Sequence, residues 1–280
     1  MNFPKNTQPL ATLVLGGNGK TGRKVAERLS KLNVPVRIGS RSGNPRFDWM
    51  EESTWRPALK GMDAVYVTFQ PDLTIPEAQP LIEAFARTAV QSGIKKLVFL
   101  SGRGEKEAQM CESLIINCGA PWTIVRCSWF NQNLSESFLV EPIQSGVVAL
   151  PVGNVGEPFV DTDDVADVVV AALTEQGHDG QVYELTGPRL LTYAQVVGEI
   201  AQATGRDIRF IQVTPEEYAE ELKAAQVPPE FIDLILHLFT EVMDGRNASL
   251  TDGVQRALGR QPKDFSTFVT ETVGTGVWKG

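Results

Sequence analysis

Residues 15–23 read Leu-Gly-Gly-Asn-Gly-Lys-Thr-Gly-Arg, and this stretch decides the fold. An apolar run, residues 10–15, leads into it. After it, Val25, Leu29 and Leu32 recur at the spacing of one helix face. The pattern therefore predicts a strand, a tight glycine turn and a helix in direct succession.

The glycines of this turn are spaced as G-x-x-G-x-x-G. Between a strand and a helix, one glycine allows a tight turn, the next lets backbone N–H groups approach a pyrophosphate, and the third lets helix and strand pack closely. The helix N-terminus favours the negative charge of the pyrophosphate. We therefore expect a dinucleotide to bind here, at Gly16, Asn18, Gly19, Lys20, Thr21 and Gly22.

The same turn imitates the end of a P-loop, because Gly19, Lys20 and Thr21 match G-K-[ST]. A P-loop needs a further glycine five residues before Gly19, and that position holds Val14. No apolar strand ends in an aspartate suited to hold magnesium. Phosphoryl transfer is therefore disfavoured.

Strands and helices alternate through the first half of the chain, which predicts a Rossmann-type, doubly wound parallel sheet in residues 1–150. Beyond residue 151 the pattern is less regular, and we expect a smaller α+β substrate domain over residues 151–280, some segments of which return to the first domain. The expected strands are residues 10–15, 34–39, 46–49, 63–69, 96–101, 122–126, 159–160 and 182–185. The expected helices are residues 20–32, 76–92, 105–118, 163–173, 192–204 and 229–243.

Composition limits the class of protein. The chain has 280 residues, 42% of them apolar, and carries 34 acidic against 26 basic residues, for a net charge of -8. This is enough apolar material for a buried core, and the acidic balance argues against direct binding of nucleic acid. The polar N-terminus lacks the apolar segment of a signal peptide, and no apolar run approaches the roughly 20 residues of a membrane span. We expect a cytoplasmic protein without a membrane segment.

Cysteines and histidines suggest neither disulfides nor a metal site. Cys111, Cys118 and Cys127 form no C-x-x-C pair, and an odd count argues against a disulfide framework. His178 and His237 are solitary, without metal-ligand spacing.

The second strand ends in Gly39, Ser40 and Arg41, where an NAD-specific site usually places an acid for the ribose hydroxyls. A guanidinium can pair with a 2′-phosphate, and Ser40 can add a hydroxyl, so Arg41 favours NADP over NAD. Arg37 is a competing candidate within the same strand. Further along, Asp48 and Trp49 either border the adenine or form a plain surface turn.

Five segments follow in the order seen in NmrA-like atypical short-chain dehydrogenase/reductases, and the chain resembles this family over nearly its whole length. The glycine turn, the Ser-Trp-Phe-Asn-Gln-Asn run at 128–133 and residues 100–103 look most like the festuclavine and agroclavine dehydrogenase type, the ergot-alkaloid reductases, and their bacterial relatives. The five segments are residues 16–22, 97–101, 121–133, 159–167 and 185–188.

The resemblance implies an NAD(P)-binding Rossmann domain and a smaller domain on the substrate side. It implies that the end of the third strand approaches the cofactor, and that Ser101, at the place of the family's usual serine, is the one catalytic candidate. It also implies a substrate region beside the nicotinamide. The cofactor residues so assigned are Phe69, Gln70, Pro71, Ser101 and Gly102, and the substrate residues are Trp129, Phe130 and Asn133. Arg103 joins the substrate residues because it leaves the fourth strand at the carboxyl edge of the sheet, where ligands of this fold bind.

One departure from the family bears on mechanism. Most short-chain dehydrogenases use a Tyr-x-x-x-Lys pair to exchange a proton with substrate, and none of the four tyrosines here has a lysine four residues later. They are Tyr66, Tyr183, Tyr193 and Tyr218. Epimerase and dehydratase chemistry is therefore disfavoured.

Hydride transfer needs no such pair when the acceptor already carries positive charge or draws its proton from water. We expect an NADPH-dependent reductase of an iminium, a quinone or an activated double bond in a small aromatic or apolar substrate. The rival hypothesis is a non-catalytic NADP-binding redox sensor that acts through a protein partner, as NmrA-like regulators do. A homodimer is compatible with either.

Overall fold

The computed structural model describes residues 9–280, which form two compact units. Unit 1 comprises residues 9–127, Thr162–Leu185 and Asp252–Gln261, and unit 2 comprises Ser128–Asp161, Thr186–Thr251 and Pro262–Gly280. The first segment of unit 1 ends at Cys127, where the sequence led us to expect residue 150, because residues 147–150 pair with a strand of unit 2. Two later segments belong to unit 1, and the return of some segments to the first domain was expected.

Unit 1 is built on six parallel strands in the order β2-β1-β3-β4-β5-β7. The Rossmann-like α/β prediction is confirmed. Because β1 leads to β2 on one side and β3 lies on its other side, the order of the strands reverses between β1 and β3, where ligands of such sheets bind. The strands are β1 (Thr12–Leu15), β2 (Val36–Gly39), β3 (Ala64–Val67), β4 (Lys96–Gly102), β5 (Trp122–Cys127) and β7 (Gln181–Leu185).

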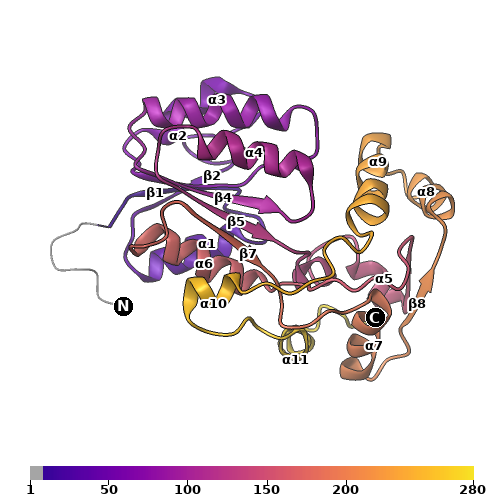
Figure 1. Ribbon diagram of the computed structural model, residues 1–280. Helices are drawn as coiled ribbons and strands as arrows, with labels where there is room; N and C mark the ends of the chain where they lie inside the picture. Colours follow the sequence, from indigo (N-terminus) through magenta and orange to yellow (C-terminus); the bar gives the residue numbers. More distant parts are fainter. Residues whose placement is uncertain (1–8) are drawn as a thin grey trace. The chain divides into compact units, whose positions relative to one another are not determined.

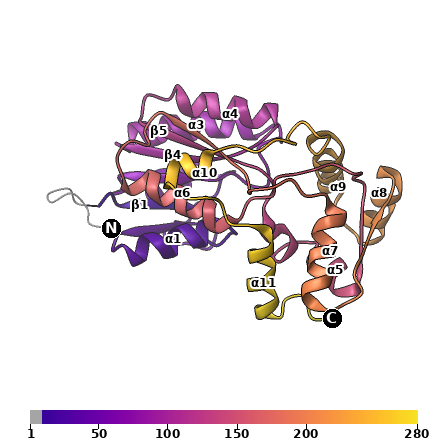
Figure 2. The ribbon, with the colours of Figure 1, turned by 60° about the horizontal axis from the view of Figure 1, so that its bottom comes forward.

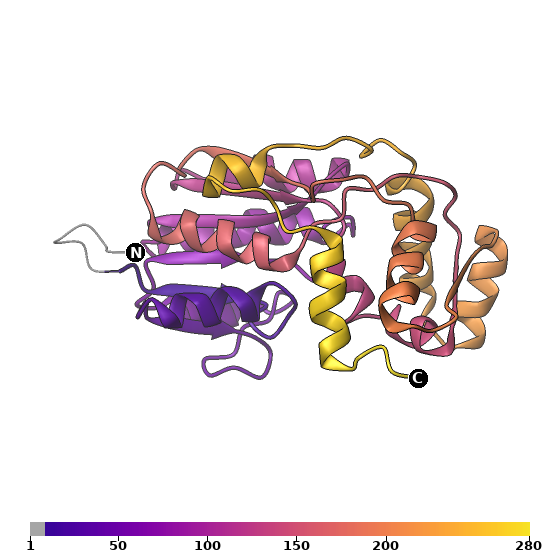
Figure 3. The ribbon, with the colours of Figure 1, turned by 90° about the horizontal axis from the view of Figure 1, so that it is seen from below.

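Helices cover both faces of this sheet (Figure 1). Helices α2, α3 and α4 share one apolar core with the sheet, in which Trp55 and Phe85 pack with Leu13, Val65 and Phe99. Seen from below in Figure 3, α1 and α6 both lie in front of the strands on the opposite face. The helices of unit 1 are α1 (Gly22–Lys31), η1 (Glu52–Thr54), α2 (Trp55–Leu59), α3 (Ala78–Gln91), α4 (Lys106–Ile116), α6 (Thr162–Thr174) and α10 (Gly253–Leu258).

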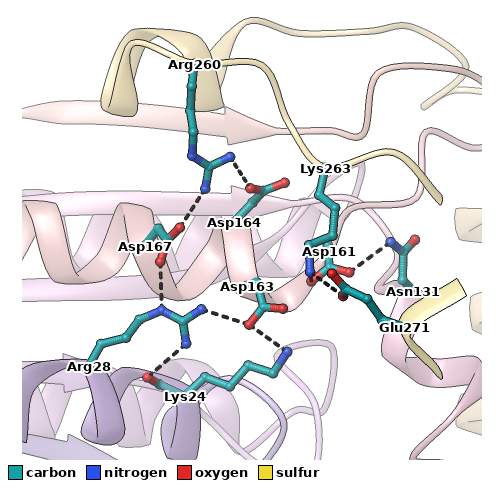
Figure 4. Close-up of polar contacts among 10 residues, drawn as sticks. All are labelled: Lys24, Arg28, Asn131, Asp161, Asp163, Asp164, Asp167, Arg260, Lys263 and Glu271. Carbon is teal, nitrogen blue, oxygen red and sulfur yellow. Dashed lines mark hydrogen bonds and ion pairs between the residues drawn. The ribbon is translucent and has the colours of Figure 1, made fainter. Parts of the chain in front are cut away.

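The acidic residues of α6 join three helices (Figure 4). Arg28 of α1 donates to Asp163 at 2.8 Å and to Asp167 at 2.7 Å. Arg260, which follows α10, donates to Asp167 and to Asp164, both at 2.6 Å. The three aspartates at the start of α6 therefore hold α1, α6 and the segment after α10 together. This role accounts for the closely spaced acidic residues at 163, 164 and 167.

Unit 2 contains a two-stranded parallel sheet, β6 (Val147–Leu150) and β8 (Arg209–Gln212), surrounded by helices. Its apolar core includes Phe265, Phe268 and Trp278, and the Trp278 indole donates to the Leu134 carbonyl at 2.7 Å. Helix α11 lies beside α7 (Figure 2). The helices are η2 (Asn131–Leu134), α5 (Val140–Ser145), α7 (Tyr193–Thr204), α8 (Pro215–Ala224), α9 (Pro229–His237), the π-helical η3 (Leu238–Val242) and α11 (Phe265–Thr275).

Two expected strands are wrong. Residues 46–49 form no strand, because the Phe47 amide bonds to the Ser40 carbonyl at 2.9 Å and the Asp48 amide to the Thr54 hydroxyl at 3.0 Å. At residues 159–160 only a single bridge forms, between Val160 and Phe130. Within residues 9–280, every helix is too short or too polar to cross a bilayer.

Candidate active site

At two positions of the first turn, neighbouring atoms of the protein leave no space for a side chain, so glycine is required there. Gly16 has φ 60°, and a Cβ on it would lie 2.5 Å from the Thr68 hydroxyl, which donates to the Leu15 carbonyl at 3.1 Å. A Cβ on Gly22 would lie 2.2 Å from the Gly16 carbonyl oxygen. Thr68, just beyond β3, thus closes the turn from one side, and the start of α1 closes it from the other.

Gly19 differs from these two, because little in the chain occupies the space beside it. A Cβ there would meet the Gly16 carbonyl oxygen at 3.2 Å and the Gln70 side-chain amide only at 3.9 Å. Within residues 9–280, no side chain caps the N-terminus of α1, and its first turn holds no acid. The Thr21 hydroxyl instead accepts from Tyr66 at 3.0 Å. An open backbone before an uncapped helix N-terminus fits a pyrophosphate.

The two arginines that compete for the 2′-phosphate have different surroundings. Arg37 donates to the carbonyls of Ala58 and Lys60, at 2.8 and 2.7 Å, and so holds the end of α2. Arg41 is exposed, and its guanidinium makes no hydrogen bond or ion pair with residues 9–280. Ser40 turns the chain beside it by accepting from the Gly43 amide at 3.0 Å. Arg41 is therefore the guanidinium that remains available after β2.

Asp48 and Trp49 have structural contacts that account for both. The Trp49 ring is 8% exposed and packs among core aromatic residues, and its indole donates to the Thr68 carbonyl at 3.0 Å. The Asp48 carboxylate accepts from Arg46 at 2.7 Å. Of the two alternatives, these contacts favour the turn over an adenine wall, although Trp49 lies in the core instead of at the surface.

The loop after β3 reaches the glycine turn. Phe69 is buried against Trp49, whereas Gln70 and Pro71 are exposed. A Cβ on Gly19 would come within 3.9 Å of the Gln70 side-chain amide, and one on Gly16 within 2.5 Å of the Thr68 hydroxyl. The end of β3 and the glycine turn therefore lie next to each other at the switch point between β1 and β3.

The end of β4 presents a buried hydroxyl without a partner. The Ser101 Oγ is buried and makes no hydrogen bond with residues 9–280. At the next residue, a Cβ on Gly102 would lie 2.5 Å from a carboxylate oxygen of Glu105. The Glu105 carboxyl group therefore lies directly over the Gly102 backbone, a contact that the sequence alone did not indicate.

Arg103 takes part in a buried network of charges. Its Nε donates to Glu184 of β7 at 2.6 Å, and its side chain is only 7% exposed. Arg126 of β5 donates to the same Glu184 at 3.2 Å and to Glu112 of α4 at 2.6 Å. This pairing favours a structural role for Arg103 in place of the expected contact with substrate. Glu112 is buried, and Arg126 compensates its charge.

The expected substrate residues at 129–133 belong to unit 2. Trp129 is partly buried, with its ring centroid 5.2 Å from that of Phe239, and its carbonyl accepts from the Val160 amide at 2.8 Å. Phe130 is also partly buried, and its carbonyl accepts from the Asn133 amide at 3.0 Å. Trp129 packs against the core of unit 2.

Comparison with known proteins assigns the family. The family model described as NAD(P)H-binding matches residues 16–176, which include the glycine turn, Arg41 and Ser101. The chain belongs to the NAD(P)H-binding family. One relative is festuclavine synthase II of Penicillium roqueforti (strain FM164). It is 30% identical over 278 residues, which cover 91% of this chain and 96% of the relative.

Solved structures share the fold of this NAD(P)H-binding protein. An NADPH-dependent quinone oxidoreductase of Escherichia coli, solved with NADPH, has a TM-score of 0.79 at 18% identity and covers 94% of this chain and 99% of that one. The negative transcriptional regulator NmrA has a TM-score of 0.68 at 16% identity, with 96% and 98% covered. The resemblance to festuclavine-type reductases and to NmrA is confirmed.

The tyrosines of this NAD(P)H-binding protein are poor proton donors. Burial raises the pKa of Tyr66, Tyr183 and Tyr193, and it raises the pKa of Tyr218 to about 12. A phenol with a raised pKa holds its proton more tightly than a free tyrosine does. Arg256 lies over the Tyr183 ring, 5.3 Å from its centroid, but burial outweighs the effect of its charge on the pKa. The sequence has no lysine four residues after any of the four tyrosines.

Proposed function

We propose that the protein is an NADPH-dependent reductase that transfers hydride to an iminium, a quinone or an activated double bond of a small aromatic or apolar molecule. The observation that carries the choice of cofactor is the guanidinium of Arg41, which lies just after β2, is exposed and makes no hydrogen bond or ion pair with the described residues 9–280. An acid at this place would repel a 2′-phosphate, and none follows β2 directly.

Bound NADPH would supply the hydride, and the chain would supply binding and orientation. The open backbone at Gly19 and the uncapped start of α1 would hold the pyrophosphate. Arg41 and Ser40 would hold the 2′-phosphate. The buried hydroxyl of Ser101 has no hydrogen-bond partner in the described part of the chain, which suits a hydrogen bond to the nicotinamide or the substrate.

The substrate class rests on the proton requirement of the reaction. With no acidic tyrosine, an acceptor that already carries a positive charge, or that needs only a weak acid, suits the site best. The names of the similar proteins, a festuclavine synthase and a quinone oxidoreductase, support the same class. We therefore place a neutral ketone or a sugar nucleotide outside the proposed range.

A second candidate is an NADP-binding redox sensor that acts through a protein partner. The fold shared with the transcriptional regulator NmrA favours it, as does the absence of the Tyr-x-x-x-Lys pair. A sensor must bind oxidised and reduced cofactor with very different affinities. A reductase need only bind both well enough to turn over.

The experiment is a calorimetric titration with NADPH, NADP+, NADH and NAD+, on the wild-type protein and on Arg41→Ala. Arg46→Ala is the matched control, because Arg46 lies in the same loop but already pairs with Asp48 and Glu51. Charge-assisted hydrogen bonds contribute about 1.5–3 kcal/mol, so Arg41→Ala should weaken NADPH roughly 10- to 100-fold and leave NADH nearly unchanged. Equal affinities for NADPH and NADH in the wild type would overturn the choice of cofactor.

A further inference from the structure

Glu105 begins α4, but its side chain does not cap this helix. It occupies the N-cap position without a side-chain hydrogen bond to the helix, and its carboxyl group lies over the backbone of Gly102 instead. Within residues 9–280, no group donates a hydrogen bond to this carboxyl. The side chain is only partly exposed. An acid so placed lacks the partners that usually keep a carboxylate charged.

The charges that face Glu105 are acidic. Asp72, in the loop after β3, and Glu107, in the first turn of α4, both disfavour its ionised form. The neighbouring Lys106 is exposed, and Arg103 is paired with Glu184. Burial, followed by repulsion from Asp72 and then Glu107, raises the pKa of Glu105 to about 8. The group is therefore largely protonated at neutral pH.

Asp72 and Glu105 come from loops that follow the adjacent strands β3 and β4, at the edge of the sheet where ligands of this fold bind. A second, independent feature lies at the same edge. Ser101 is 4% exposed, and its hydroxyl oxygen is buried. This hydroxyl has no hydrogen-bond partner among residues 9–280. An unpaired buried hydroxyl costs free energy unless a ligand completes its hydrogen bond. The end of β4 therefore carries the Ser101 hydroxyl, which can bond to a ligand, and Glu105 follows it by four residues.

We propose that Glu105 is the proton donor of the reduction, the role left open by the missing Tyr-x-x-x-Lys pair. The inference rests on the proposed reductase function. Addition of hydride to a neutral acceptor such as a quinone gives the acceptor two electrons and leaves a negative charge on its oxygen. The carboxyl O–H of Glu105 breaks, and its proton bonds to that oxygen. The Glu105 carboxylate then regains a proton from solvent.

This role predicts a difference between two members of the proposed substrate class. An iminium ion needs no proton, so only its hydride transfer would be catalysed, whereas a quinone would draw on Glu105 as well. Catalysis with a quinone should therefore require the acid form and should fall as the pH rises through about 8. Catalysis with an N-alkyl iminium ion should show no such decrease.

The experiment measures kcat for a benzoquinone and for an N-methyl iminium ion, with saturating NADPH, across this pH range. Glu105→Gln keeps the size of the side chain and removes its proton, so it should lower kcat for the quinone about 100-fold or more and abolish the pH dependence. The iminium rate should change less than twofold. Glu107→Gln, in the first turn of α4, is the control. It keeps the acid at Glu105 and should keep the quinone activity, with the decrease moved to lower pH because a neighbouring negative charge is lost.

Asp72→Asn tests the electrostatics without removing the acid. The amide oxygen can still accept from the Thr74 amide and hydroxyl, as the carboxylate does at 2.9 and 2.8 Å. Loss of the negative charge should lower the pKa of Glu105 and move the decrease in quinone kcat to lower pH. A purely structural role for Glu105 would not produce this shift.

The outcomes separate the two proposals. If the wild type oxidises NADPH with both acceptors and Glu105→Gln leaves the quinone rate and its pH dependence intact, Glu105 is not the donor, and the reductase function stands. If the wild type turns over neither acceptor, the function fails, and the role of Glu105 fails with it. An infrared carboxyl band that titrates near pH 8 in the wild type and is missing from Glu105→Gln would establish the protonated acid independently of activity.

Discussion

Alanine at two glycines of the first turn should have opposite effects. Gly22→Ala places a methyl group 2.2 Å from the Gly16 carbonyl oxygen and 2.7 Å from its carbonyl carbon, both backbone atoms. Gly19→Ala places one 3.2 Å from the nearest atom, at a glycine whose φ lies outside the left-handed region. We expect the first variant to unfold more easily and the second to fold normally but to bind cofactor poorly.

The magnitudes follow from these distances. A backbone overlap as close as that at Gly22 should cost about 3 kcal/mol of unfolding free energy or more, at the upper end of overpacking. At Gly19, the lower entropy of an unfolded alanine contributes about 0.4–1 kcal/mol and offsets the close contact, so stability should change by less than about 1 kcal/mol. The same methyl group would stand where the pyrophosphate approaches, at a cost of about 1–3 kcal/mol, or roughly 5- to 150-fold in affinity.

Urea unfolding measures the first quantity, and calorimetric titration with NADPH measures the second, on the same two variants. Wild-type affinity for NADPH in Gly19→Ala would refute the reasoning, because the space beside Gly19 would then have no ligand to hold. A stable Gly22→Ala would show that the turn can rearrange, against the packing described for Gly16.

Three further predictions concern single side chains. Hydrogen bonds from Arg189 hold the pKa of Asp264 well below its usual range. The resulting stabilisation is present above about pH 4 and is lost as the pH falls through the pKa of the folded state. Arg189→Ala should therefore lower the unfolding free energy at pH 7 and make it depend less on pH in acid, as measured by urea unfolding at several pH values. Trp49→Phe leaves the Thr68 carbonyl without its donor and should cost about 1–3 kcal/mol of unfolding free energy, with NADPH affinity unchanged by calorimetry. Ser101→Ala removes a buried hydroxyl without a partner, so it should preserve or raise the unfolding free energy while lowering kcat; a large loss of stability would contradict this.

The fold could be predicted where the apolar pattern was strong. Strands β1, β3, β4 and β5 are largely buried apolar runs, which stand out in the sequence. The glycine turn after β1 indicated the succession of strand, turn and helix, and it also indicated the family. Strands β6 and β8 were missed, because β6 is only half buried and β8 is largely exposed, which leaves little apolar periodicity to read.

The site was predictable only in its local part. The glycine turn and Arg41 lie within single loops, so sequence spacing was enough to propose them. Arg103 was expected at the substrate because it leaves the fourth strand at the carboxyl edge of the sheet. Its ion pair with Glu184 of β7, far along the chain, could not be read from sequence spacing. Glu105, which we propose as the proton donor, was not singled out from the sequence because an acid at a helix start is ordinary. Its distinguishing feature is the proximity of Asp72, which depends on the order of β3 and β4 in the sheet.

The most direct test of the central claim is acceptor-dependent oxidation of NADPH, followed by the loss of nicotinamide absorbance, with cofactor and acceptor in large excess over protein. A reductase predicts many turnovers with at least one iminium ion, quinone or activated alkene, faster with NADPH than with NADH. Tight binding of NADP(H) with strong preference for one redox state, and no turnover with any of the three acceptor classes, would contradict it and establish the sensor in its place.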